Sequence, residues 1–276
     1  MTTSTASTST LKRHRRRNKT LRRILTFYLP MALFIVFLLF PFYWMLMTAI
    51  KPNAELIPQG NFLEVNPFVV QRPTLEHFRF LLTETRYPRW FANTFTIALS
   101  ATSITVVISF LAAFGITRIR FPGASGFGFA IYLAYLVPPA LLFIPLANIL
   151  IRLRLFDNIL GLILIYPTFL MPFCTWLLIG FLKTIPHELE EAARLDGASW
   201  LQIMMQVILP LSVPGLISST IFCFTLSGEE FLYALVFMSS PNNKTISVGL
   251  ITELVRGDVF QWGPLMAGAL MAAVPV

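Results

Sequence analysis

Long apolar runs separated by short polar segments dominate the pattern of this chain. A helix of about 20 apolar residues crosses a hydrocarbon core of about 30 Å and satisfies its own backbone hydrogen bonds there. Runs of at least that length cover residues 27–50, 91–116, 124–150, 159–182 and 213–238, and a last run begins near residue 263. The pattern therefore predicts an all-α membrane protein, a polytopic bundle of about six transmembrane helices.

The first apolar run is long enough to be a membrane anchor, whereas the last is too short to be a complete span. The run at residues 27–50 exceeds the apolar region of about 7–15 residues in a cleaved signal peptide, and it lacks a small-residue cleavage site, so it predicts an uncleaved anchor. Residues 264–276 would form a helix of only about 20 Å at about 1.5 Å per residue. Because such a helix cannot cross the membrane, we expect the last helix to be cut short, with a re-entrant helix as the alternative.

The polar segments divide the chain into three parts. Residues 1–26 join a Ser-, Thr- and Ala-rich start to a basic cluster and predict a disordered cytoplasmic tail. Residues 27–90 predict the first transmembrane helix and a proline-punctuated extracytoplasmic loop, which contains one short helix around residues 75–82. Residues 91–276 predict the membrane core, which a cytoplasmic loop at residues 183–212 interrupts.

Composition and charge agree with this interpretation. Hydrophobic residues make up 56% of the chain, charged residues only 12%, and the mean hydropathy is +0.72. A soluble domain usually carries about 25% charged residues. Much of the net charge of +8 comes from a basic cluster between Lys12 and Arg23. Such a cluster is typical of a cytoplasmic flank that contacts membrane lipid, and because no aromatic platform accompanies it, we predict no nucleic-acid binding.

Residues 183–212 have the pattern of a helix and a sharp turn. Glutamates crowd the first turns of the helix, where they complement the positive end of its dipole. Glu190 precedes Arg194 by four residues, the order that favours an ion pair on a helix. Gly197 can take the left-handed conformation that ends a helix. The segment therefore predicts a short acidic helix that stops at a tight turn.

A second short helix is predicted to begin at Trp200, because Ser199 and Gln202 have the spacing of a capping box. Pro210 and Pro214 then break the chain before the next span. Such a surface element is either an amphipathic helix lying in the headgroups or a docking helix for another protein. Anionic lipid repels an acidic helix, so the pattern favours docking.

The same loop resembles the EAA loop in the membrane subunits of ATP-binding cassette (ABC) importers, whose pattern is E-A-A, three residues, G, and then L-P. The matching residues are Glu191, Ala192, Ala193, Gly197, Leu209 and Pro210. The resemblance implies that this is a coupling helix, which sits in a cleft of the ATPase subunit. It also implies that the contact is made by Glu191, Ala192, Ala193, Asp196 and Gly197.

The resemblance extends from about residue 93 to the end of the chain and implies the fold of the type I importer permeases. The run at residues 207–214 is similar to the maltose-type carbohydrate branch. Residues 227–229 read Ser-Gly-Glu and depart from the Trp and Asn that this branch often carries. The resemblance thus implies a permease for a sugar or oligosaccharide. Permeases for polyamines and glycerol phosphate share the loop and remain alternatives.

Side chains in the fifth run are candidates for a solute path. They are Ser227, Glu229, Glu230 and Tyr233. An ionisable residue within a membrane helix usually faces the bundle interior or water, so the two glutamates predict a polar lining. A structural hydrogen bond, an ion pair with a partner subunit and a proton relay are the alternatives. A proton relay would make the protein an ion-coupled secondary transporter, although no internal repeat is visible.

The sequence predicts no catalytic residue, no metal site and no cofactor. Glu190 and Glu191 are adjacent, so on a helix they point about 100° apart and cannot flank one bond as an acid–base pair. No Gly is followed by Lys, so the chain lacks a P-loop. ATP must therefore be hydrolysed by another polypeptide.

The resemblance also implies a set of partners. They are a second homologous permease in a heterodimer, two ATP-binding cassette ATPase subunits and an extracytoplasmic solute-binding protein. We expect a multi-pass protein of the cell membrane with a cytoplasmic N-terminus, because the basic tail, Arg118, Arg120 and Lys183 then share one side.

Overall fold

The computed structural model describes residues 24–56, 69–119, 121–256 and 259–274, and these are almost entirely helical. The first half contains η1 (Ile24–Tyr28), α2 (Leu29–Ile50), α3 (Asn53–Leu56), α4 (Glu76–Glu84), α5 (Tyr87–Arg118), α6 (Ala124–Tyr135), η3 (Pro139–Leu142) and α7 (Phe143–Arg152). The second half contains α8 (Ile159–Leu182), α9 (Glu188–Leu195), α10 (Trp200–Gln202), η4 (Ile203–Ile208), α11 (Leu209–Leu211), α12 (Val213–Glu229), α13 (Leu232–Phe237), α14 (Ile246–Leu254), β1 (Val255–Arg256), β2 (Val259–Phe260) and α15 (Trp262–Ala273). The predicted helical membrane fold is confirmed, with one addition: β1 and β2 form a small antiparallel pair.

Three helices are long and apolar enough to cross a membrane: Thr26–Ile50, Tyr87–Arg118 and Ile159–Leu182. Two further helix pairs meet the same criterion only when each pair is taken together. Gly126–Tyr135 and Pro139–Arg152 are bent by 92°, and Trp200–Leu211 and Val213–Glu229 are bent by 73°. If each bent pair is one span, the described residues hold up to five, and α15 is a shorter apolar helix at the place of the predicted sixth.

The N-terminal boundaries follow the predictions in part. The predicted disordered tail lies outside the described residues except for residues 24–26, which are helical and continue through η1 into α2. The short helix expected around residues 75–82 is α4. The first core span begins slightly before residue 91, because Pro88 lies in the first turn of α5, where its missing N–H has no helical partner.

The third apolar run is not one straight helix, and it meets the length and hydropathy of a span only as a bent pair. α6 ends at Tyr135, and the chain is bent by 92° before it continues through η3 and α7. Pro138 has an extended ψ of 126°, as expected for a residue that precedes proline. Pro138 and Pro139 supply no N–H donors, so the helical hydrogen-bond ladder cannot pass through them.

The fifth apolar run is also broken, so the prediction of one helix over residues 213–238 is wrong. α12 ends at Glu229, and Glu230 has an extended backbone with ψ 128°. α13 then begins at Leu232. Glu230 therefore lies at a break between two helices and not inside a continuous span.

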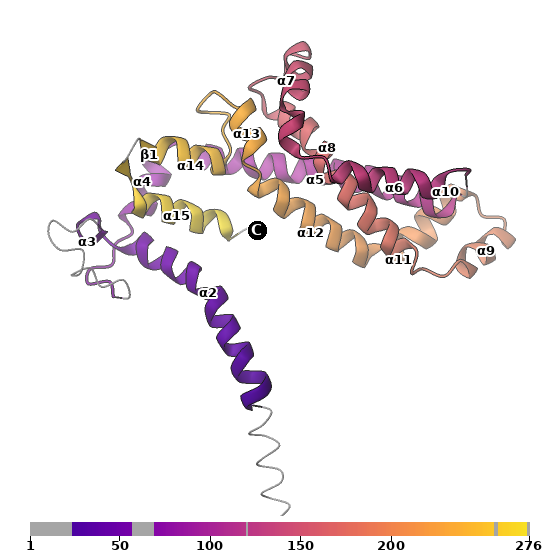
Figure 1. Ribbon diagram of the computed structural model, residues 1–276, viewed down its shortest axis with the longest axis horizontal. Coiled ribbons are helices and arrows are strands. Elements are labelled where there is room, and N and C mark those ends of the chain that lie inside the picture. Colours follow the sequence, from indigo (N-terminus) through magenta and orange to yellow (C-terminus); the bar gives the residue numbers. More distant parts are fainter. Residues whose placement is uncertain (1–23, 57–68, 120, 257–258, 275–276) are drawn as a thin grey trace, which may run out of the picture.

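The centre of the bundle is formed by α5, α8 and α12, which pack against one another, while α6 packs on α8 (Figure 1). Their facing sides carry the main apolar core. Among its buried members are Ile97, Phe110, Phe114, Leu170, Leu178 and Cys223. α9 and α10 lie at one end of the bundle, and α4 and the strand pair lie at the other (Figure 1). The loop at residues 183–212 and α4 are thus at opposite ends of the bundle.

α2 projects away from this bundle (Figure 1). Only its last part packs on the body, where Ala49 is buried in a second cluster with residues of α4, α5, α14 and α15. The rest of the helix is uncovered, as shown by Val36 at 66% and Phe37 at 74% exposure. An apolar helix of this kind faces lipid or another membrane subunit.

Candidate docking loop and solute path

The turn after α9 is a Schellman motif closed by Gly197. The N–H of Gly197 donates to the carbonyl of Arg194 at 3.0 Å, and the N–H of Ala198 donates to the carbonyl of Ala193 at 2.9 Å. This pair of bonds requires a left-handed residue after the helix, and Gly197 has φ +84°. The predicted left-handed turn is therefore confirmed, and it fixes the direction in which α9 ends.

The second predicted feature of the loop, a capping box at the start of α10, is also confirmed. The Ser199 hydroxyl accepts from the Gln202 N–H at 3.4 Å, and the Gln202 side chain accepts from the Ser199 N–H at 2.7 Å. Both bonds satisfy helix N-terminal donors that would otherwise lack partners. The turn and the cap together give the loop a defined shape without help from a partner.

The outward side of α9 combines acidic, small and apolar side chains. Glu191, Ala192, Asp196 and Gly197 are exposed, whereas Ala193 is half-buried against the main core. Three leucines of the same loop are also exposed: Leu189 at 43%, Leu195 at 89% and Leu201 at 66%. Sequence analysis did not single out these leucines, because their six-residue spacing matches no helical period. Large exposed apolar side chains of this kind suit a contact with another protein or with lipid.

The predicted ion pair between Glu190 and Arg194 is not the one that forms. Glu190 is buried, and its Oε1 lies 2.8 Å from Nε of Arg118 at the end of α5. The Arg194 guanidinium lies over the Trp200 ring at 4.9 Å from its centroid. A helical spacing rule considers only residues on one helix, and here a residue far away in the sequence is the better partner.

Arg118 makes further contacts that sequence analysis missed. Its Nη2 donates to the carbonyls of Leu182 at 2.8 Å and Ile185 at 3.0 Å, and its Nη1 lies 2.9 Å from Nδ1 of His187. The only sequence signal was an arginine at the end of an apolar run, which also suits a membrane flank.

Leu209 and Pro210 lie in α11, where the loop returns to the membrane. Leu209 is half-buried against the main core and Pro210 is exposed. The π-helix η4 comes directly before them, and such a widened turn is common where proline removes a backbone donor. The chain then bends by 73° into α12, as Pro210 and Pro214 had predicted.

Glu230 has a structural role at the break between α12 and α13. Its Oε1 accepts from the N–H of Tyr233 at 2.7 Å, and its Oε2 accepts from the N–H of Ala234 at 3.1 Å. The Tyr166 hydroxyl donates to Oε2 at 2.9 Å. The carboxylate therefore caps the first turn of α13 and ties it to α8, which is the structural alternative considered above.

Tyr233 and Ser227 are also enclosed. Tyr233 is 1% exposed, its hydroxyl donates to the Pro139 carbonyl at 3.1 Å, and its ring stacks on Phe169. Ser227 is 3% exposed, and its hydroxyl has no hydrogen-bond partner within the described part of the chain. Neither side chain is accessible to a solute in this conformation.

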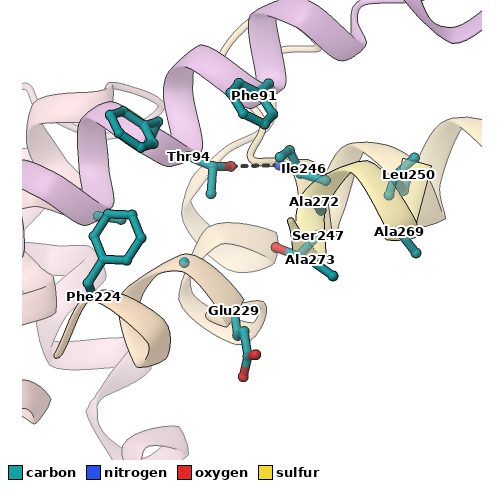
Figure 2. A pocket seen from close by; sticks show the side chains of 13 residues that line it. Phe91, Thr94, Phe224, Glu229, Ile246, Ser247, Leu250, Ala269, Ala272 and Ala273 are labelled. Carbon is teal, nitrogen blue, oxygen red and sulfur yellow. Dashed lines mark hydrogen bonds between the residues drawn. The ribbon is translucent and has the colours of Figure 1, made fainter. Parts of the chain in front are cut away.

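Glu229, in contrast, is exposed and lines a cavity of about 310 Å³ among α5, α12, α14 and α15 (Figure 2). The walls are mainly aromatic and small apolar, with Phe91, Phe95, Phe224, Ala269 and Ala272 among them. On one wall the Thr94 hydroxyl accepts from the Ile246 N–H at 2.9 Å. Of the four candidate path residues, Glu229 alone combines exposure with a cavity.

Residues 86–276 match the family described as the inner membrane component of binding-protein-dependent transport systems. The chain belongs to this family. The match begins next to the start of α5, so the family core comprises α5 to α15, and α2 precedes it.

Relatives and a solved structure of this family's fold support the same conclusion. The inner membrane ABC transporter permease protein YcjP of Escherichia coli is 34% identical over 94% of this chain and 90% of its own length. The permease SmoH of the sulfoquinovosyl glycerol transport system of Agrobacterium fabrum is 32% identical over 86% of this chain and 81% of its own. The crystal structure of a bacterial ABC transporter involved in the import of alginate matches with a TM-score of 0.76 at 20% identity, over 100% of this chain and 95% of that one.

The resemblance to ABC importer permeases is therefore confirmed. As an inner membrane component of a binding-protein-dependent transport system, the protein is a multi-pass membrane protein that acts in transport.

Proposed function

We propose that this inner membrane component is the permease subunit of an ABC importer for a sugar or oligosaccharide, and that α9 couples it to a separate ATPase. The observation that carries the proposal is the preformed loop of α9 and α10, held by a Schellman turn and a capping box. Its exposed acidic residues and leucines form a docking surface at the cytoplasmic end of the bundle. The contact residues are Glu191, Ala192, Ala193, Asp196 and Gly197, and Leu209 with Pro210 turns the chain back into the membrane.

The proposed assembly contains a second homologous permease, two ATP-binding cassette ATPase subunits and an extracytoplasmic solute-binding protein. Much of the apolar surface of α2 is exposed, and such a surface is suited to lipid or to a packed helix of another subunit. This exposure agrees with the presence of a second membrane subunit. The orientation has the N-terminus and α9 on the cytoplasmic side, where the ATPase subunits bind. The opposite end, with α4 and the strand pair, then faces the binding protein.

The carbohydrate substrate is supported by the permease SmoH, whose system transports sulfoquinovosyl glycerol. The cavity beside Glu229 is chemically suited to such a solute, because aromatic walls accept the apolar faces of a sugar and a carboxylate accepts its hydroxyl groups. We place Glu229 on the solute path. Glu230 and Tyr233 act in packing, and Ser227 lies behind the path.

A pull-down in mild detergent from native membranes tests the coupling proposal. The wild-type chain should retain a P-loop ATPase, and a chain with Asp196→Lys and Gly197→Val should lose it. Glu84→Lys is the matched control, since it reverses an exposed charge on α4 at the other end of the bundle. Recovery of the chain alone in all variants would overturn the proposal and favour the ion-coupled transporter.

Uptake of labelled solutes tests the substrate class. Cells should import a sugar only while ATP is available, and a panel of maltose, sulfoquinovosyl glycerol, spermidine and glycerol 3-phosphate separates the alternatives. Preferred uptake of spermidine or glycerol 3-phosphate would exclude the carbohydrate assignment without affecting the coupling proposal.

A further inference from the structure

Arg118 joins three elements at the cytoplasmic end of the bundle. It is the last residue of α5, and its side chain has 0% exposure. Its guanidinium reaches carbonyls at the end of α8 and two side chains of the docking helix region, Glu190 in α9 and His187 directly before it. Buried charges are costly unless they are paired and hydrogen-bonded. Here Nη1 and Nη2 are hydrogen-bonded, and Nε forms an ion pair with Glu190 without a hydrogen bond among the described residues.

We propose that Arg118 is the positioning residue that locks α9 to the ends of α5 and α8. A displacement of α9 then moves these two spans and does not merely bend the connecting loop. The inference rests on the proposed docking role of α9 and adds the path by which the motion reaches the membrane.

The chemistry of the contact requires arginine. Its planar fork directs Nε and Nη1 toward Glu190 and His187, and Nη2 toward the Leu182 and Ile185 carbonyls. The Leu182 carbonyl is the last of α8 and the Ile185 carbonyl lies three residues beyond it, where the negative end of the helix dipole favours a cation. A lysine ammonium has the same charge but cannot reach both groups in fixed directions.

Glu190 is the residue of α9 that pairs with Arg118. It is 4% exposed, although its neighbours Glu188 and Glu191 are exposed on the same short helix. Ile185 and Ala193 also pack against the main core, but apolar contacts permit rotation and sliding. The hydrogen bond between Arg118 Nη1 and His187 has a defined direction, and the ion pair with Glu190 holds the first turn of α9 beside it, so together they set the orientation of α9.

The test uses the assembled transporter in lipid nanodiscs with two spin-label pairs. The first pair joins Glu188→Cys at the start of α9, where the native side chain is exposed and is not among the proposed contact residues, to Leu99→Cys on α5. The second pair joins Leu99→Cys to Val213→Cys at the start of α12 and reports on the bundle alone. Pulsed electron paramagnetic resonance gives the width of each distance distribution.

Arg118→Lys and Arg118→Met should broaden the loop distribution about twofold while the bundle distribution stays narrow, because the direction of the contact is lost. Glu190→Gln keeps the size of the side chain and should give a smaller broadening. Arg152→Met, which changes an exposed arginine at the end of α7, should leave both distributions unchanged.

A loop distribution as narrow as that of the wild type in Arg118→Lys or Glu190→Gln would overturn the inference. Broadening of both label pairs would also overturn it, because Arg118 would then only support the fold. If Arg118→Met does not assemble, the other two variants decide. The proposed function is tested separately, because it is contradicted only if the wild-type complex contains no ATPase.

Discussion

Glu229 and Glu230 are adjacent, and the end of α12 between them separates their roles. Glu229 is the last helical residue and its side chain is exposed beside a cavity. The extended backbone of Glu230 turns its carboxylate toward the amides of Tyr233 and Ala234. We therefore propose that the same residue type serves the solute path at one position and the packing at the next.

Replacing each glutamate with glutamine should separate these roles. Glu230→Gln weakens the cap of α13, so the protein in detergent should lose about 0.5–2 kcal/mol of stability, which a lower midpoint of thermal unfolding would show. Glu229→Gln should leave that midpoint unchanged. It should raise the solute concentration for half-maximal uptake by roughly 10- to 150-fold, since one charge-assisted hydrogen bond contributes roughly 1.5–3 kcal/mol. If Glu229→Gln lowered the unfolding midpoint and Glu230→Gln impaired uptake instead, Glu230 would be on the solute path and Glu229 in the packing.

Gly197 sets the direction of the docking loop, and its substitutions should follow its backbone conformation. Gly197→Val should reduce the ATPase recovered with the permease about tenfold, because a left-handed conformation costs a non-glycine residue roughly 1–2 kcal/mol and a β-branched residue more. Gly197→Asn should retain most of the ATPase, since asparagine tolerates this conformation. Co-purification followed by ATP hydrolysis measures both variants. Equal loss in both would show that the side-chain volume matters and not the turn.

At the scale of elements, the sequence predicts the straight spans and the bend before α12, whereas hydropathy does not place the breaks inside the third and fifth apolar runs. α2, α5 and α8 are continuous runs, so hydropathy alone locates them. The break before α7 depends on two prolines whose effect on direction is not visible in hydropathy, and the break after α12 depends on the amides that Glu230 caps. Mean hydropathy averages over a window and contains no information about which hydrogen bonds continue.

The approach of α14 to α5 depends on Gly249, where a Cβ would overlap the Trp90 ring. Trp90 cannot move easily, because its Nε1 donates to the Pro241 carbonyl at 2.8 Å. Gly249→Ala should therefore destabilise the protein by about 1–3 kcal/mol, as overpacking of a core does. Gly180→Ala is the control, since the same added carbon meets nothing within 4 Å. Thermal unfolding in detergent compares them, and equal midpoints would mean that α14 shifts at no cost.

Asp157 connects the loop before α8 to the loop after α13 and should make that connection sensitive to pH. Partial burial raises its pKa, but bonds from the Ser240 hydroxyl and from the N–H groups of Ser239 and Ser240 hold the pKa below its ordinary value. Because the pKa of Asp157 is lower in the folded protein, its carboxylate stabilises the connection at pH values above the pKa that it has in the unfolded chain. This stabilisation is lost as the pH falls through the pKa that it has in the folded protein.

Hydrogen exchange of the Ser239 and Ser240 amides should therefore accelerate, after correction for the intrinsic rate, as the solution is acidified below the usual range for aspartate. Asp157→Asn cannot ionise and should show faster exchange without this dependence on pH. The same pH profile in both proteins would place the sensitivity in another group.

For the whole molecule, the sequence predicts the family and the docking loop but not how the loop is attached. Glu191, Ala192, Ala193 and Gly197 are contiguous enough to be recognised as a pattern. The pair of Arg118 and Glu190 joins segments that are far apart in the chain, and only the packing of α5 beside α8 brings them together. Sequence spacing therefore predicts contacts within a helix and fails where the bundle creates a better partner.

The proposed orientation of the molecule rests on the charge of the basic tail and can be tested at both ends of the bundle. Leu195→Cys on the docking loop and Asn242→Cys after α13 introduce exposed thiols, while the native Cys174 and Cys223 are buried. With the N-terminus in the cytoplasm, a membrane-impermeant maleimide should label Asn242→Cys in intact cells. It should label Leu195→Cys only after permeabilisation.

Charge sets this preference because positively charged flanks remain on the cytoplasmic side during insertion. Arg118, Lys183 and Arg194 lie at the same end but are few, so most of the bias comes from the cluster between Lys12 and Arg23. Replacing the basic residues of that cluster with glutamine should make both cysteines partly reactive in intact cells. Unchanged labelling would show that the core spans alone determine the orientation, and labelling of Leu195→Cys in intact wild-type cells would reverse the topology and the proposed site of ATPase docking.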